Sequence, residues 1–226
     1  FFSFSMPSYK LTYFPIEGAA EKVRLAFVMS GIEFEDNRVA FPQWQELKPK
    51  TKFGQLPMLE VDGKEMTQSG ALLRWVASKG DGSLYPSDPD ARYKVDEMVG
   101  MCEDLARDWS PSLYMGMRPT KFGYPADMTK EAQQEITKAL REKFIAEDLP
   151  RYAKYIENAV AAGGGGFLCG EKPTIADLTL LPQLRYYTKG VADFVAQDCL
   201  EPYPAITSYI ERMMNVPQIK EWYAAH

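Results

Sequence analysis

The first third of the chain mixes short strand-like segments with one helical segment. Residues 9–14, YKLTYF, are rich in β-branched and aromatic side chains, which is typical of a strand. Residues 20–30 are largely apolar from Val23 onward and are followed by Gly31, which predicts a helix and its end. Residues 34–39 predict a second short strand. A strand, helix, strand order with a helical crossover predicts that the two strands pair in parallel.

Two more strands follow, joined by a tight turn. Residues 58–61 and 64–67 flank Asp62-Gly63, a dipeptide typical of two-residue hairpins, so we expect these strands to be antiparallel. Residues 68–79 then predict a helix with Ser69 as its cap. The order β-α-β followed by β-β-α is a thioredoxin-like layout.

The pattern changes at residues 81–90, DGSLYPSDPD, whose composition is typical of a linker. Beyond it no strand pattern occurs, and apolar residues recur at steps of three and four, as in amphipathic helices. One such helix is expected near 95–109 and another at 136–160, with short ones near 205–214 and 217–225. Thr174, three residues before Asp177, forms a capping box that opens an almost wholly apolar helix. We therefore expect an α/β, thioredoxin-like domain at 6–81 and an all-helical domain at 91–226.

Composition excludes several classes of function. A net charge of −5 without any block of basic residues argues against nucleic acid as a partner, and no apolar run approaches the length of a membrane span. Three widely separated cysteines indicate neither a disulfide framework nor a zinc site, which fits a reducing cytoplasm. The only histidine is His226, which removes Ser-His-Asp and Cys-His catalysis. We expect a soluble cytoplasmic protein whose acid-base chemistry uses tyrosines, carboxylates or groups of a ligand.

Residues 1–5, FFSFS, precede Met6 and lack the basic flank and long apolar core of a signal peptide. Either Met6 is the natural start or the five residues remain from a trimmed leader.

Pro57 stands at the head of a predicted strand, where proline removes a hydrogen-bond donor. One interpretation is a trans proline that begins an edge strand. The other is a cis Leu56-Pro57 bond that turns the N–H and C=O of Leu56 outward, so that they can pair with an extended, peptide-like ligand.

Two further pairs of residues are suited to carboxylates. Gln68 and Ser69 open a helix, whose unpaired N–H groups and positive dipole end favour an anion. Trp44 and Lys48, four residues apart, can direct an indole N–H and an ammonium group to a second carboxylate. An ordinary serine cap and a solvated face are the alternatives. Together, these sites predict a peptide ligand with a carboxylate at each end.

Four stretches resemble cytosolic glutathione transferases in their order and spacing: YKLTYF…AAEKVRLAF, WQELKPKTKFGQLPMLEVDG, QSGALLRWVA and KPTIADL. The likeness extends from about Met6 to the C-terminus and is strongest to the sigma class, which includes the glutathione-dependent prostaglandin D synthase. It implies a cytoplasmic homodimer that uses glutathione as co-substrate and conjugates it to hydrophobic electrophiles in detoxification.

The resemblance also assigns roles to single residues. Tyr13 matches the tyrosine that donates a hydrogen bond to the sulfur of glutathione. Lowering the pKa of a thiol by ~2 units requires ~2.7 kcal/mol, and one charge-assisted hydrogen bond supplies ~1.5–3 kcal/mol. Asp104 matches an acidic residue that reaches the glutathione of the partner subunit, although a solvated helix face explains it equally well. The other glutathione contacts match Trp44, Lys48, Gln55, Leu56, Pro57, Gln68 and Ser69.

The second substrate is less well defined by the resemblance. Ala19 stands where some members carry an arginine, which weakens the likeness to prostaglandin D synthase. Gly100 replaces one residue of the acidic trio that binds a divalent ion in vertebrate members, so no metal is expected. A glutathione-dependent isomerase or peroxidase and a crystallin-like structural protein are the alternatives. Alignment places at the hydrophobic-substrate site Phe14, Ala106, Pro111, Thr179 and Gln183.

Overall fold

The computed structural model describes residues 7–226, so the expectation about residues 1–5 and Met6 lies outside the described part of the chain. The chain forms two compact units: residues up to Arg92 together with Met214–His226, and Tyr93–Met213. The sequence predicted one helical domain over 91–226, whereas its last residues here belong to the first unit. Within residues 7–226, no helix combines the length and the apolar character needed to cross a membrane.

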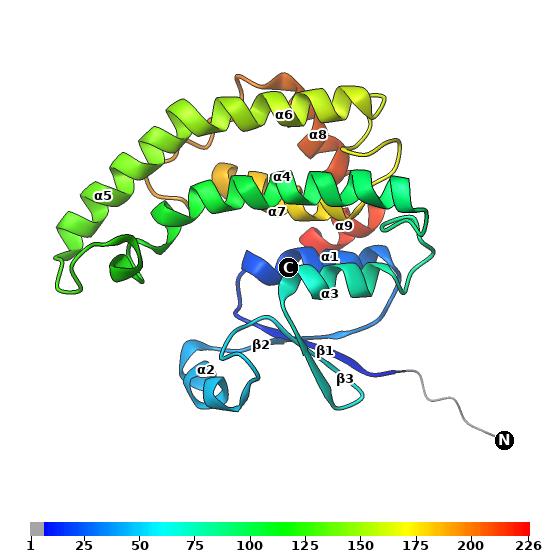
Figure 1. The fold of residues 1–226 in the computed structure, drawn as a ribbon, viewed down its shortest axis with the longest axis horizontal. Helices are drawn as coiled ribbons and strands as arrows, with labels where there is room; N and C mark the ends of the chain where they lie inside the picture. Colours follow the sequence, from blue (N-terminus) through cyan, green and yellow to red (C-terminus); the bar gives the residue numbers. More distant parts are fainter. Residues whose placement is uncertain (1–6) are drawn as a thin grey trace. The chain divides into compact units, whose positions relative to one another are not determined.

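The first unit contains a mixed four-stranded sheet (Figure 1), built from β1 (Tyr9–Tyr13), β2 (Glu35–Arg38), β3 (Met58–Val61) and β4 (Lys64–Thr67). The strand order is β2-β1-β3-β4; the parallel β1–β2 pair and the antiparallel β3–β4 pair are those that the sequence predicted, and β1 also pairs antiparallel with β3. Asp62 and Gly63 have φ values of 48° and 79°, which is the backbone conformation that a type I′ hairpin turn requires.

Helices cover this sheet and supply most of its core. The short helix η1 (Gly18–Ala20) leads into α1 (Glu21–Met29), which lies beside α3 (Ser69–Ala77) on one face of the sheet (Figure 1). The last helix, α9 (Pro217–Ala225), packs against α1. Leu11 and Leu59 from the strands and Phe27 and Leu72 from the helices are fully buried between these layers.

The segment after β2 forms a helix that the sequence pattern did not predict. It comprises α2 (Phe41–Leu47) and η2 (Lys48–Lys50). The Gln43 side chain accepts a 2.8 Å hydrogen bond from the N–H of Ala40, which fixes the start of α2. With seven residues, α2 is too short to show a repeating apolar pattern.

The second unit is all-helical. Its elements are α4 (Pro89–Tyr114, which begins in the first unit), η3 (Pro119–Phe122), α5 (Lys130–Lys143), η4 (Phe144–Asp148), α6 (Leu149–Ala162), α7 (Ile175–Thr188) and α8 (Pro204–Met214). The sequence predicted one helix over 136–160, but a π-helical segment, η4, separates α5 from α6. Pro150 has no N–H to donate to the carbonyl four residues earlier, and a wider turn accommodates this loss.

The predicted capping box starts the buried helix α7. The hydroxyl of Thr174 accepts the N–H of Ala176 at 3.3 Å, and the carboxylate of Asp177 accepts the N–H of Thr174 at 2.7 Å. Asp177 is fully buried and also accepts the N–H of Leu168 at 2.9 Å and the hydroxyl of Tyr209 at 3.0 Å. This carboxylate therefore ties α7 to the preceding loop and to α8.

Candidate functional site

Tyr13 ends β1, and the loop that follows encloses its phenol. The side chain is 9% exposed, and its hydroxyl oxygen accepts a 3.1 Å hydrogen bond from the backbone N–H of Ala19. Gly18 lies against the same ring with a φ of +45°, and a Cβ atom there would be 2.6 Å from the Tyr13 hydroxyl oxygen. The close approach of this backbone to the phenol therefore requires glycine at position 18.

A cavity of about 160 Å³ opens next to this loop in the first unit. Its walls come from η1, from the segment before β3 and from the start of α3. It brings together five of the residues expected to contact glutathione, and Ala19 links it to the Tyr13 hydroxyl. Phe53 and Thr67 also line it and were not predicted, because neither carries a pattern that distinguishes it from neighbouring loop and strand residues. The lining residues are Ala19, Phe53, Gln55, Leu56, Pro57, Thr67, Gln68 and Ser69.

The Leu56-Pro57 bond is cis, which is the second of the two interpretations left open by the sequence. Pro57 is buried directly before β3. Among the residues that the structure describes, neither the N–H nor the C=O of Leu56 bonds another backbone group. An extended ligand beside this segment can therefore pair with Leu56 in the manner of strand addition.

The other end of the cavity is the start of α3. Gln68, the N-cap residue, has a φ of +72°, a left-handed value that is uncommon outside glycine and is often found at binding sites. Its side chain makes no capping hydrogen bond. The first N–H groups of α3 and the positive end of its dipole therefore favour an anion at this position.

Trp44 and Lys48 are not among the residues that line this cavity. The Trp44 indole is buried, and its ring makes an edge contact with Phe14, whose centroid is 6.1 Å away. The Phe14 ring in turn contacts Tyr13, at 5.5 Å between centroids. Lys48 is exposed, and its aliphatic carbons lie beside Gly54, just before the cavity residue Gln55.

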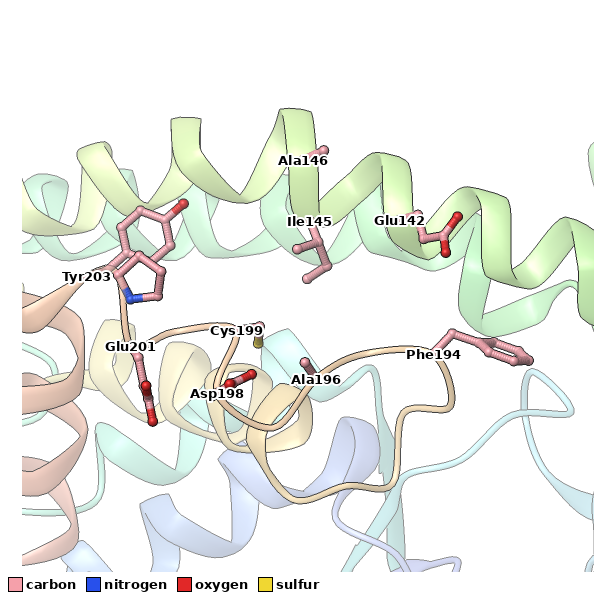
Figure 2. Close-up of a pocket in the computed structure, with 10 residues that line it drawn as sticks. Glu142, Ile145, Ala146, Phe194, Ala196, Asp198, Cys199, Glu201 and Tyr203 are labelled. Atoms are coloured by element: carbon pink, nitrogen blue, oxygen red, sulfur yellow. The ribbon is translucent and has the colours of Figure 1, made fainter.

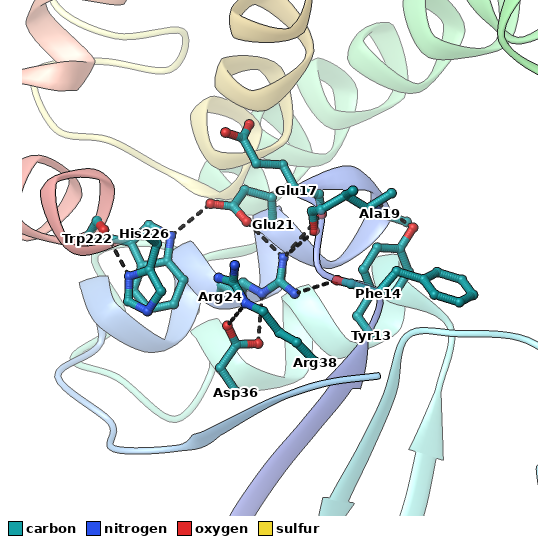
Figure 3. Close-up of polar contacts among 11 residues, drawn as sticks. Tyr13, Phe14, Glu17, Ala19, Glu21, Arg24, Asp36, Arg38, Trp222 and His226 are labelled. Atoms are coloured by element: carbon teal, nitrogen blue, oxygen red, sulfur yellow. Dashed lines mark hydrogen bonds and ion pairs between the residues drawn. The ribbon is translucent and has the colours of Figure 1, made fainter. Parts of the chain in front are cut away.

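A buried ionic cluster next to the Tyr13 loop was not predicted from the sequence (Figure 3). Arg24 is fully buried and contacts Glu21 at 3.0 Å and Asp36 at 2.9 Å. Its guanidinium also donates to main-chain carbonyls of the loop after β1, and Trp222 of α9 donates to Glu21 at 2.8 Å. The signal in the sequence was the pair Glu21 and Arg24, three residues apart at the start of a helix that is apolar from Leu25 onward.

The expected residues of the second unit are not among those that line the cavity beside the Tyr13 loop. Asp104, on α4, is exposed and pairs with Arg107 at 2.6 Å. On α7, the hydroxyl of Thr179 donates to the carbonyl of Ile175 at 2.8 Å, and the amide of Gln183 donates to the hydroxyl of Tyr187 at 2.7 Å. On α4, Ala106 is exposed and Pro111 is half-buried; Phe14 belongs to the first unit.

A hollow in the second unit lies elsewhere and is lined by none of those residues. Figure 2 shows it between the α5–η4 region and the loop before α8. Its volume is about 740 Å³. Burial raises the pKa of its Cys199 thiol to about 11, so this thiol is protonated at neutral pH and is a poor nucleophile. In the described part of the chain, no group of three or more His, Cys, Asp or Glu residues is arranged to hold a metal ion.

Comparisons with known proteins indicate one family over nearly the whole chain. Two family models match: "Glutathione S-transferase, N-terminal domain" over residues 9–78 and "Glutathione S-transferase, C-terminal domain" over residues 124–226. Glutathione S-transferase 1 of Ascaris suum is 33% identical over 219 residues, which is 97% of each chain.

Solved structures show the same similarity. The prostaglandin synthase D of Nilaparvata lugens superposes with a TM-score of 0.78 at 28% identity, covering 96% of this chain and 97% of its own. A structure described as a monomeric glutathione S-transferase of Necator americanus gives a TM-score of 0.74 at 31% identity, covering 97% of both chains.

Proposed function

Because the chain belongs to the glutathione S-transferase family, whose members use glutathione as co-substrate, we propose that it conjugates glutathione to hydrophobic electrophiles and that Tyr13 holds the reacting thiolate. The observation that carries this proposal is the 3.1 Å hydrogen bond from Ala19, a cavity residue, to the Tyr13 hydroxyl oxygen. A hydroxyl that accepts such a bond becomes a stronger donor through its own O–H. Tyr13 therefore acts as a neutral donor to sulfur and not as a base.

The cavity next to Tyr13 supports a peptide ligand. In this proposal, the peptide group of Leu56 pairs with the backbone of glutathione, with Gln55 beside it and Pro57 fixing the turn. The γ-glutamyl carboxylate lies at the start of α3, near Gln68 and Ser69, where helix N–H groups stabilise it. Trp44 and Lys48 then hold the glycine carboxylate, at the opposite end of glutathione from the γ-glutamyl group.

The assignment to the sigma class is part of the same proposal, as are a cytoplasmic homodimer and the contact of Asp104 with glutathione of the partner subunit. In this chain Asp104 would exchange its exposed pairing with Arg107 for the ammonium group of glutathione. The hydrophobic co-substrate would lie near Phe14, Ala106, Pro111, Thr179 and Gln183.

A glutathione-dependent isomerase is the second candidate, favoured by the similarity to the insect prostaglandin synthase D. Such an enzyme regenerates glutathione at each turnover, whereas conjugation consumes it. Product analysis with an endoperoxide substrate and with an aryl halide separates the two reactions.

The test of the Tyr13 role is the rate of conjugation to an aryl halide near pH 6.5. If Tyr13 lowers the thiol pKa by ~2 units, the Tyr13→Phe variant loses about a hundredfold in rate because it loses that share of thiolate. Tyr9→Phe is the matched control, since Tyr9 lies on the same strand but its ring contacts Phe27 and Trp75 instead of the Tyr13 loop. Equal rates for wild type and Tyr13→Phe would remove Tyr13 from the mechanism.

A further inference from the structure

The buried guanidinium of Arg24 donates hydrogen bonds to the main chain of the loop after β1. Arg24 donates from Nη1 to the carbonyl of Ile16 at 2.8 Å and to that of Glu17 at 3.3 Å, and from Nη2 to that of Phe14 at 3.4 Å. These three carbonyls belong to the stretch that connects Tyr13 to Gly18. The position of the Ala19 N–H against the Tyr13 hydroxyl therefore depends on where Arg24 is held.

The side chain of Arg24 is held in turn by two carboxylates. Its Nε donates to Asp36 at 2.9 Å, and Asp36 accepts a second bond from Arg38 at 2.8 Å. Its Nη1 donates to Glu21 Oε2 at 3.0 Å. A buried charge requires such complete pairing, because losing one partner leaves the others with an uncompensated desolvation cost.

The remaining oxygen of Glu21 is bonded by the last helix. The indole N–H of Trp222 donates to Glu21 Oε1 at 2.8 Å across 201 positions of sequence. Figure 3 shows this path from Trp222 through Glu21 and Arg24 to Phe14 and Glu17. Trp222 and Glu21 are both buried, so water cannot readily replace the donor if it is removed.

From this geometry we propose that Trp222 is a positioning residue for Tyr13: its indole N–H fixes Glu21, which fixes Arg24, which fixes the loop that donates to the Tyr13 hydroxyl. The inference rests on the proposed role of Tyr13. Without the indole N–H, Glu21 turns its free oxygen toward the Arg24 guanidinium. That rearrangement competes with the carbonyls of Ile16 and Glu17, and the loop loosens around the phenol.

The test variant is Trp222→Phe, which keeps an apolar ring and removes the N–H donor. The readout is the pKa of the glutathione thiol bound to the enzyme, followed by the ultraviolet absorbance of the thiolate. We expect this pKa to rise by about half a unit or more, with about a threefold fall in kcat/KM near pH 6.5 and an unchanged KM for the electrophile.

Phe34→Leu is the matched control for packing. The Phe34 ring lies 6.0 Å from the Trp222 ring, so this change loosens the same contact of α9 but leaves the N–H to Glu21 in place. It should alter the melting temperature without altering the thiol pKa. If Phe34→Leu shifts the thiol pKa as much as Trp222→Phe does, packing explains the effect and the proposal is wrong.

A double-mutant cycle separates this inference from the proposed function. With Tyr13→Phe already present, adding Trp222→Phe should change the thiol pKa no further. If the two substitutions shift the thiol pKa additively, the positioning role of Trp222 is wrong and the role of Tyr13 stands. The same conclusion follows if Tyr13→Phe shifts the thiol pKa but Trp222→Phe leaves it at the wild-type value. A wild-type pKa in Tyr13→Phe instead overturns the proposed function itself.

Discussion

The backbone N–H of Ala19 donates a 3.1 Å hydrogen bond to the hydroxyl oxygen of Tyr13, six residues earlier in the chain. Ala19 also lines the cavity that begins the proposed glutathione site. One backbone group thus joins the end of β1 to that cavity, and it donates to the oxygen of the phenol that we propose as the donor to sulfur.

Gly18 provides a direct test of this relationship. Gly18→Ala introduces a methyl group 2.6 Å from the Tyr13 hydroxyl oxygen, so the phenol or the loop must move. We expect a loss of activity of about tenfold or more, because small displacements of reacting groups are costly. Gly31→Ala is the control, since Gly31 also has a positive φ but no atom within 4 Å of an added Cβ. Gly31→Ala should lose stability from its positive φ alone and Gly18→Ala should lose more, measured by urea unfolding, and only Gly18→Ala should lose activity.

The capping box of α7 should contribute more to stability than an exposed cap does. Thr174→Ala removes a buried hydroxyl bonded to Ala176 and Asp177, and we expect the free energy of unfolding to fall by about 1–2 kcal/mol. Thr129→Ala removes a similar bond, to Ala132 at 3.2 Å, at the exposed start of α5 and should cost about 0.5–1 kcal/mol. Equal losses in chemical denaturation would contradict the importance of burial at α7.

The thiols of Cys169 and Cys199 should resist alkylation in the folded protein. Burial raises the pKa of each from an ordinary value of 9.0 to about 11. Because only the thiolate reacts, iodoacetamide labelling below pH 9 should be about a hundredfold slower than in urea. The folded rate should then keep rising with pH until about pH 11. Mass spectrometry of the labelled peptides measures this, and a plateau near pH 9 in the native state would contradict the shift.

Asp104 should affect glutathione binding only if a partner subunit uses it. Asp104→Asn is expected to weaken glutathione binding by about tenfold or more, as expected for loss of a charge-assisted hydrogen bond. Glu103→Gln, at the neighbouring exposed position, should leave the affinity unchanged. Titration of tryptophan fluorescence gives the affinities, and light scattering gives the oligomeric state. A monomer, or equal affinities in all three proteins, would exclude a shared site.

Local patterns in the sequence were sufficient for the four strands, the hairpin and the cap of α7, but the predicted Ser69 cap of α3 was wrong, because Gln68 is the N-cap residue there and makes no side-chain capping bond. The Asp62-Gly63 turn and the Thr174–Asp177 box involve neighbouring residues whose chemistry fixes the backbone directly. The segments expected to bind glutathione were predicted in the same way, because each is a short motif, and their role in binding stays a prediction. Five of their residues, from Gln55 to Ser69, line one cavity.

Most of the features that the sequence did not predict depend on contacts between segments that are far apart in the chain. Trp222 and Glu21 are 201 positions apart, and no periodicity in either helix indicates that the indole N–H meets that carboxylate. The packing of α9 against α1 was not predicted for the same reason. The π-helical segment before Pro150 was missed because its apolar spacing resembles that of an ordinary helix.

The ionisation of bound glutathione tests the central claim most directly. Titrating the thiolate absorbance of glutathione bound to the wild-type enzyme should give a pKa about 2 units below that of the free thiol, and Tyr13→Phe should restore the free value. Tyr9→Phe should match wild type. A bound thiol that ionises at the same pH as free glutathione, or a Tyr13→Phe variant with an unchanged pKa, would contradict the account.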